Sequence, residues 1–203
     1  LLVRRLVDTV AMGGVYMMNI SPLPDGTIPQ EQQERLLAIG TWLDVNGEAI
    51  YGTRAWKKYG EGPYADAPAA PWRSPGPDDP PGESFSGKEF RFTTKGDTLY
   101  AIVMDWPESG EVLITSLRSG AESHAEGKVE RVEMLGFARP LQFTQNERGL
   151  LVKMPPASSK PCAGLAARSR RGWAFQATVW AAAFSIVSPP PKICGCRRSI
   201  FSQ

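Results

Sequence analysis

Apolar residues near the start of the chain recur at intervals of three and four. They place one apolar face on a helix whose other face carries Arg4, Arg5 and Asp8. The apolar positions are Leu2, Val3, Leu6, Val7 and Val10. Gly13 and Gly14 follow, and glycine readily adopts the left-handed conformation that ends a helix. The pattern therefore predicts an amphipathic helix that stops at these glycines.

A short and nearly continuous apolar run, Val15–Ile20, comes next. A run of this length after a glycine stop predicts a buried parallel strand. Two prolines and an Asp-Gly pair then predict a loop over residues 21–26. Thr27–Gln30 has the spacing of a capping box with proline in the first turn, which predicts a helix over Thr27–Val45.

The order helix, strand, loop, helix is typical of an α/β domain with a parallel sheet. A single strand cannot form a sheet, because its backbone groups need partners on both sides. The following residues do not supply parallel neighbours. Residues 60–87 are rich in Pro, Gly, Ala and Asp, which predicts a long exposed loop or linker.

Beyond this stretch the apolar period becomes two. Short β-branched and aromatic runs separated by turns predict an antiparallel β-sandwich. The expected strands are Glu89–Thr94, Thr98–Trp106, Val112–Leu117, Val129–Leu135, Leu141–Thr144 and Leu150–Met154. From Cys162 onward neither period is present, so we expect an irregular or disordered tail.

The length, net charge and histidine content argue against several classes of function. The chain has 203 residues, 42% hydrophobic and 22% charged, which is typical of one large or two small globular domains. A net charge of +2 is too small to favour nucleic acid as a partner. The one histidine, His124, argues against a histidine-rich metal site or a Ser-His-Asp triad, and its polar surroundings favour an exposed loop residue. We predict no cofactor and no metal.

From the sequence we expect no targeting segment and no membrane span within these residues. The opening LLVRRL lacks the order of a secretory signal, so we expect the chain to begin within a fold. The longest apolar stretch, Trp173–Val187, is shorter than the roughly 18 residues of a membrane span and contains polar residues. The compartment is left open.

The last part of the chain differs in charge and in cysteine content. No Asp or Glu follows Glu147, while all three cysteines, Cys162, Cys194 and Cys196, lie beyond it. Three cysteines without a nearby histidine are a weak indication of a metal or redox site. The basic clusters Arg168–Arg171 and Arg197–Arg198 favour a solvated tail over a surface for phosphate or anionic lipid, a less favoured third hypothesis.

Four segments carry a family resemblance. They are GGVYMMNISPLPDGTIPQEQQERLLAIG, WLDVNGEAIYGTRAW, FTTKGDTLYAIVMDWP and VEMLGFARPLQFTQNERGLLVKMP. Together they resemble glycoside hydrolase family twenty-nine, the α-L-fucosidases, from Leu1 to about Cys162. The resemblance implies a (β/α)8-like barrel followed by a C-terminal β-sandwich, and a full barrel needs about 250 residues.

The resemblance divides the chain into four parts. Residues 1–56 would be the last helix-strand-helix of the barrel, an α/β remnant, and residues 57–87 a Pro/Gly-rich linker or loop. Residues 88–161 would form the all-β antiparallel sandwich, and residues 162–203 an atypical tail.

The implied activity is hydrolysis of terminal α-L-fucosyl groups with retention. One Asp attacks the sugar while a second carboxylic acid serves as acid and then as base. In the family both lie on earlier barrel strands, and no position here matches either, so we assign no catalytic residue. We expect the chain alone to be inactive, with a fucosylated glycan bound by the missing barrel. The alternative is a non-catalytic carbohydrate-binding or structural β-sandwich module, and the oligomeric state is left open.

Several polar residues are candidates for sugar contacts. Asp25 follows the expected strand on the usual catalytic side of a barrel, but its place before Gly26 favours a turn residue. Glu31 and Glu48 fit a helix cap and a turn. Asn19 fits strand-end packing better than contact with the sugar.

Three aromatic residues offer rings that stack on sugars. They are Trp42, Tyr51 and Trp56, and packing in a core or between domains is the favoured interpretation for each.

The chain departs from the family pattern at the barrel mouth and in the tail. Val15 stands where the family often has Asn, and Ser21 where it often has Gly. After Cys162 the family usually continues into a last strand, whereas this chain has AGLAARSRRGWAFQ. We hypothesise that Ala163–Gln203 is a translated frameshift or an assembly error, which would leave the sandwich without its last strand and with an open edge.

Overall fold

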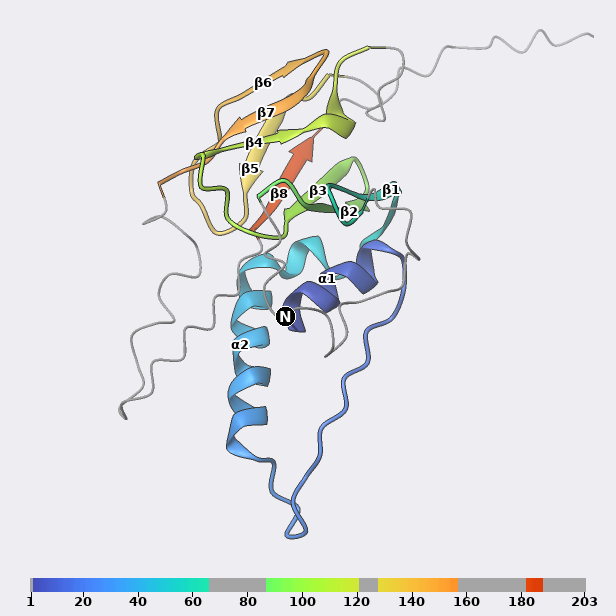
Figure 1. The fold of residues 1–203 in the computed structure, drawn as a ribbon, viewed down its shortest axis with the longest axis vertical. Helices are drawn as coiled ribbons and strands as arrows, with labels where there is room; N and C mark the ends of the chain where they lie inside the picture. Colours follow the sequence, from blue (N-terminus) through green and yellow to red (C-terminus); the bar gives the residue numbers. More distant parts are fainter. Residues whose placement is uncertain (1, 66–86, 121–127, 157–181, 188–203) are drawn as a thin grey trace, which may run out of the picture.

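A computed structural model describes residues 2–65, 87–120, 128–156 and 182–187 (Figure 1). The fold consists mostly of β-strands, with few helices. The helices are α1 (Leu2–Ala11), α2 (Gln30–Asn46) and the short 3-10 turns η1 (Gly47–Ala49) and η2 (Thr115–Leu117). The strands are β1 (Arg54–Glu61), β2 (Phe90–Lys95), β3 (Thr98–Val103), β4 (Glu111–Ile114), β5 (Arg131–Met134), β6 (Phe143–Asn146), β7 (Gly149–Lys153) and β8 (Ala182–Val187).

The strands form two antiparallel sheets. The larger has the order β1-β2-β3-β8-β5, and the smaller has the order β4-β7-β6. Lys95 pairs with Thr98 across the tight turn that joins β2 to β3, and Leu99 pairs with Ile186 of β8. Gly96 in this turn has φ 57°, a conformation that glycine adopts without steric cost.

The main core lies between the two sheets. Alternate residues of each strand fill it, because successive side chains point to opposite faces. Phe90, Phe92 and Ile114 are fully buried there, as are Leu150 and Phe184. The sandwich predicted from the period of two is therefore confirmed in its inner packing.

A second core lies on the outer face of the larger sheet. Tyr100, Ile102 and Met104 pack there in the same cluster as Val3 of α1 and Trp42 of α2. Figure 1 shows α1 and the end of α2 beside this sheet, while the first half of α2 extends away from it. The helices thus form a layer against the sandwich.

The first helix follows its sequence pattern. Val3, Val7 and Ala11 are buried, and Gly13 adopts φ 78° just beyond the helix end. The capping box expected at Thr27 is wrong. The helix begins at Gln30 after Pro29, with no side-chain cap, because the Thr27 hydroxyl donates to Asp25 instead.

The buried strand expected over Val15–Ile20 is not present in this chain. The segment is extended but pairs with no strand of the described residues, and Val15 and Met17 are 92% and 85% exposed. The sequence pattern is that of a strand, but a strand needs neighbours to satisfy its backbone groups and to cover its side chains.

The last strand of the larger sheet lies in the tail, so the expected loss of a sandwich strand is wrong. The strand β8 pairs with β3 on one side and β5 on the other. Its Phe184 and Ile186 alternate into the main core, which is the physical reason that this short segment forms a strand. The irregular tail expected from residue 162 is thus wrong for Ala182–Val187. The frameshift hypothesis for Ala163–Gln203 stays a prediction.

The other strands match their expected positions to within a few residues. The exception is β1, which crosses the expected boundary at residue 57 and pairs with β2. Its Trp56 packs edge-on against Phe92, with ring centroids 5.1 Å apart, so the first residues of the expected linker belong to the sheet. Residues 66–86 of that linker lie outside the described residues.

Replacing Phe184 by Ala should lower the free energy of unfolding by about 3–5 kcal/mol, because it leaves a cavity at a fully buried site. Urea denaturation of the chain measures this loss. Ser185→Ala, on the other face of the same strand, should cost less than about 1 kcal/mol. Equal small losses for both variants would show that β8 is not part of the core.

Candidate functional site

The polar residues singled out in the sequence occupy separate local structures. Asp25 is fully exposed, and its carboxylate accepts hydrogen bonds from the Thr27 backbone N–H (3.0 Å) and hydroxyl (2.7 Å). The bond from the backbone N–H, followed by that from the hydroxyl, lowers the pKa of Asp25. Its carboxylate is therefore engaged in the turn, as its place before Gly26 suggested.

The two glutamates have different surroundings. Glu31 lies exposed in the first turn of α2. Glu48 lies in η1 and accepts a hydrogen bond of 2.7 Å from the Tyr100 hydroxyl on β3. Burial, together with this bond, raises the pKa of Tyr100 above its usual value. This hydrogen bond connects η1, which follows α2, to the larger sheet.

The aromatic candidates divide between packing and exposure. Trp42 is buried in the second core, and Trp56 is half-buried against Phe92, so packing holds for both. Tyr51 is 61% exposed, so of the two kinds of packing expected for it, packing in a core is wrong, and packing between domains stays a prediction. Asn19 is also exposed, so the strand-end packing expected for it is not present in this chain.

The remaining sequence candidates lie outside the described residues. They are His124, Cys162, Cys194, Cys196, Arg168–Arg171 and Arg197–Arg198. Within the described part of the chain, no group of three or more His, Cys, Asp and Glu residues is placed to hold a metal ion. In the same ranges, no helix has the length and apolar character that crossing a membrane requires.

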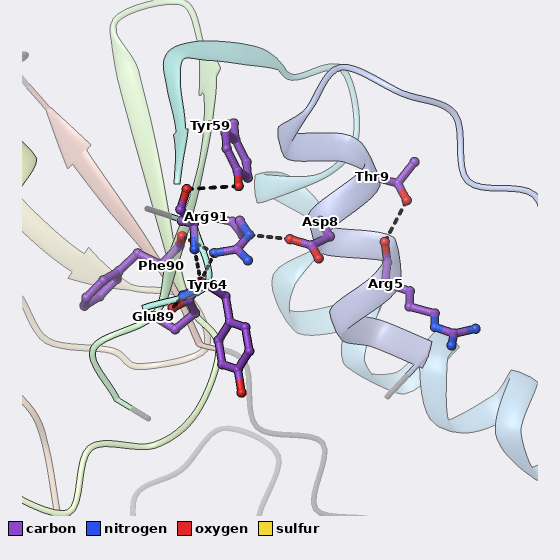
Figure 2. Close-up of polar contacts among 9 residues, drawn as sticks. Arg5, Asp8, Thr9, Tyr59, Tyr64, Glu89, Phe90 and Arg91 are labelled. Atoms are coloured by element: carbon purple, nitrogen blue, oxygen red, sulfur yellow. Dashed lines mark hydrogen bonds and ion pairs between the residues drawn. The ribbon is translucent and has the colours of Figure 1, made fainter. Parts of the chain in front are cut away.

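A buried polar cluster that the sequence analysis did not identify lies between α1 and the larger sheet (Figure 2). At its centre is Arg91 of β2, whose side chain is 3% exposed. Its Nε donates to Asp8 of α1, and its Nη1 donates to Glu89 (2.6 Å) and to the Phe90 carbonyl (2.8 Å). The guanidinium also lies over the Tyr59 ring, 5.5 Å from its centroid.

Glu89 is fully buried, and its charge is compensated from several directions. Besides Arg91, it accepts hydrogen bonds from the backbone N–H groups of Tyr64 and Ala65, both at 3.0 Å. Gly62 leaves space for this approach, since a Cβ there would lie 2.4 Å from Glu89 Oε2. A buried carboxylate held in this way is stable only while all its partners are present.

The charged neighbours of Arg91 determine its protonation state. Burial alone lowers the pKa of Arg91, but attraction from Asp8 and the hydrogen bonds to Glu89 and Asp8 outweigh this, so the net effect raises it. The guanidinium therefore stays charged, and arginine does not exchange protons at ordinary pH. Arg91 therefore positions its neighbours and does not transfer protons.

A second contact holds the other end of α1. Arg4 donates from Nε to the Met104 carbonyl at 3.0 Å, and its Nη2 lies 3.4 Å from Asp105 Oδ2. With Asp8 bound to Arg91, α1 is attached to the sandwich near both of its ends. The orientation of the helix, and with it the start of the Val15–Ile20 segment, is fixed by the sheet.

Comparison with known proteins gives one consistent result. The family described as Alpha-L-fucosidase matches residues 1–48, and the family described as Alpha-L-fucosidase C-terminal domain matches residues 84–177. The second match extends past Cys162, where the resemblance in the sequence was expected to end.

Curated relatives point the same way. An alpha-L-fucosidase of Branchiostoma floridae is 36% identical over 79% of this chain and 30% of its own length. The tissue alpha-L-fucosidase of Homo sapiens is 33% identical over 79% of this chain and 28% of its own length. The chain thus spans about a third or less of these relatives.

Solved structures share the fold. The alpha-fucosidase of Thermotoga maritima in complex with a mechanism-based inhibitor gives a TM-score of 0.62 at 26% identity. The alignment covers 92% of this chain and 33% of that protein. The same enzyme in complex with fucose gives a TM-score of 0.61 at 26% identity and the same coverage.

Replacing Arg91 by Met should destabilise the chain by about 3–5 kcal/mol, because Glu89 and Asp8 lose their buried counter-charge. Adding Glu89→Gln should recover part of this loss. Arg131→Met, which breaks the exposed pair with Glu133, should cost about 0–1 kcal/mol. Denaturant unfolding measures the free energy of unfolding of the parent, the two Arg91→Met proteins and the Arg131→Met control. If Arg91→Met lost as little stability as Arg131→Met, the role assigned to Arg91 would be contradicted.

Proposed function

This chain belongs to the α-L-fucosidase family, and we propose that it is the C-terminal part of an enzyme that hydrolyses terminal α-L-fucosyl groups of glycoconjugates. One observation carries the proposal. The exposed, unpaired segment Val15–Ile20 lies within the stretch that matches the catalytic family, residues 1–48. An apolar strand with no neighbours is what a piece of a larger sheet presents.

In this proposal, α1, the Val15–Ile20 segment and α2 are the last helix-strand-helix of a (β/α)8 barrel. The side chains of α1 that face the sandwich are already buried, whereas the first half of α2 is mostly exposed. Upstream barrel strands would pair with the segment, and upstream helices would cover α2. The length ratio supports this, because the chain spans about a third of the Thermotoga enzyme.

The proposed chemistry needs two carboxyl groups beside one glycosidic bond, about 5–5.5 Å apart in a retaining enzyme. The buried carboxylates of the described residues are already committed. Glu89 binds Arg91 and two backbone N–H groups, and Glu61 accepts from the backbone N–H groups of Thr115 (2.8 Å) and Ser116 (2.7 Å). This supports a catalytic pair in the upstream barrel, with the fucosylated glycan bound there.

The sandwich has a supporting role in this proposal. Its larger sheet provides the surface on which α1 and the end of α2 pack, and its Arg91 holds α1 in place. A glycosidase barrel needs its active-site strands fixed to within a fraction of an ångström.

The chain alone should give no turnover of an aryl α-L-fucoside above the rate without protein, because the proposed catalytic pair is absent. The full gene product, expressed with the sequence that its gene places before Leu1, should release the phenol. Fluorescent or absorbance detection of the phenol measures both. Turnover by the isolated chain, or none by the full product, would contradict the proposal.

A further inference from the structure

Exposure alternates along the unpaired segment. From Val15 to Asn19 the odd-numbered residues are exposed, Val15 at 92% and Met17 at 85%, whereas Tyr16 and Met18 are half-buried. Ile20, at the end of the segment, is 44% exposed. Successive side chains of an extended segment point to opposite faces. One face of the segment therefore lies against the rest of the protein, and the face with Val15, Met17 and Asn19 is open to solvent.

The open face corresponds to the inside of the proposed barrel. In a (β/α) barrel the helices lie outside the strands, so residues that alternate away from the helices fill the interior. The half-buried face, with Tyr16 and Met18, is the one partly covered by the remainder of this chain, and in the proposed barrel the flanking helices would lie on that side. The odd-numbered residues are thus the interior set.

The chemistry of the interior set changes along the strand. Val15 and Met17 are apolar and suit the packed interior of a barrel. Asn19 is polar and lies nearest the carboxyl end of the strand, where barrel enzymes carry out their chemistry. A polar amide taken out of water there needs a hydrogen-bonding partner.

The loop beyond the strand is already bonded within itself and to α2. The Ser21 N–H donates to Gln32 (3.0 Å), the Leu23 N–H donates to the Thr27 carbonyl (2.8 Å), and Thr27 holds Asp25. These groups have their partners in the chain. In the proposed barrel, the partner of the Asn19 amide would then lie across the open face.

We propose that the Asn19 side chain binds a hydroxyl group of the glycoside substrate. This inference rests on the proposed function. A side-chain amide offers two N–H donors and one carbonyl acceptor, which match a sugar hydroxyl that both donates and accepts. Because the amide does not titrate, Asn19 binds and orients the sugar and plays no part as acid or base.

The test uses the full gene product and the variant Asn19→Leu, which keeps the side chain's approximate size and removes its polar atoms. The value of kcat/KM on an aryl α-L-fucoside should fall about tenfold or more, because a site built to bind a hydroxyl group loses its partner. Met18→Leu, on the other face of the same segment, should stay within about twofold.

A set of monodeoxy aryl α-L-fucosides separates sugar binding from packing. On the one that lacks the contacted hydroxyl, the parent and Asn19→Leu should differ by less than about twofold, while the other analogues keep the full difference. Asn19→Ser, which stays polar but is too short to reach the same hydroxyl, gives the same comparison if the leucine variant does not fold.

Two outcomes would overturn the inference separately from the proposed function. One is an active full product in which Asn19→Leu keeps its kcat/KM. The other is a loss by the same factor on every deoxy analogue. An inactive full product would instead overturn the proposed function, and this inference with it.

Discussion

The fold depends on one strand that is apolar on both faces. In β3, Leu99, Ala101 and Val103 point into the core between the sheets, and Tyr100 and Ile102 point outward. Burying one such large side chain is worth about 1.5–3 kcal/mol, so neither face is stable in water. The helical layer is therefore needed by the sheet as much as the sheet is needed by the helices, and the two share a core across the expected domain boundary.

The polar cluster around Arg91 fixes the position of α1 on the larger sheet, which apolar packing alone does not do. Apolar packing alone lets a helix slide or rotate on a sheet, whereas a guanidinium bound to Asp8 and Glu89 fixes one position. Buried ion pairs are weak contributors to net stability, and setting a unique arrangement is their best-supported use. Here the arrangement places the start of Val15–Ile20, which links the sandwich to the proposed barrel.

Local patterns predicted the elements whose burial they determine. The three-four spacing gave α1, and the period of two gave the strands between Glu89 and Met154. The tail strand β8 was not predicted from the sequence. This six-residue segment pairs with β3 on one side and β5 on the other, so tertiary packing determines its strand conformation more than its own composition does.

The polar cluster was missed for a related reason. Glu89, just before β2, and Arg91 within it flank Phe90, an alternation that usually places the charges in solvent. Asp8 of α1 meets Arg91, and the backbone N–H groups of Tyr64 and Ala65 meet Glu89, so these two charges are buried by tertiary contacts. The strand expected at Val15–Ile20 does not form among the described residues, because its apolar pattern alone does not supply the neighbours that a strand needs.

The central claim is that Val15–Ile20 is a barrel strand without its neighbours, attached to a helical layer and sandwich that fold together. Amide hydrogen exchange followed by mass spectrometry tests it most directly, because exchange reports local opening of hydrogen bonds. In the isolated chain, β3 and α1 should be protected while Val15–Ile20 exchanges fast; in the full gene product, the segment should become protected as well. A segment that exchanges equally in both proteins would contradict the account.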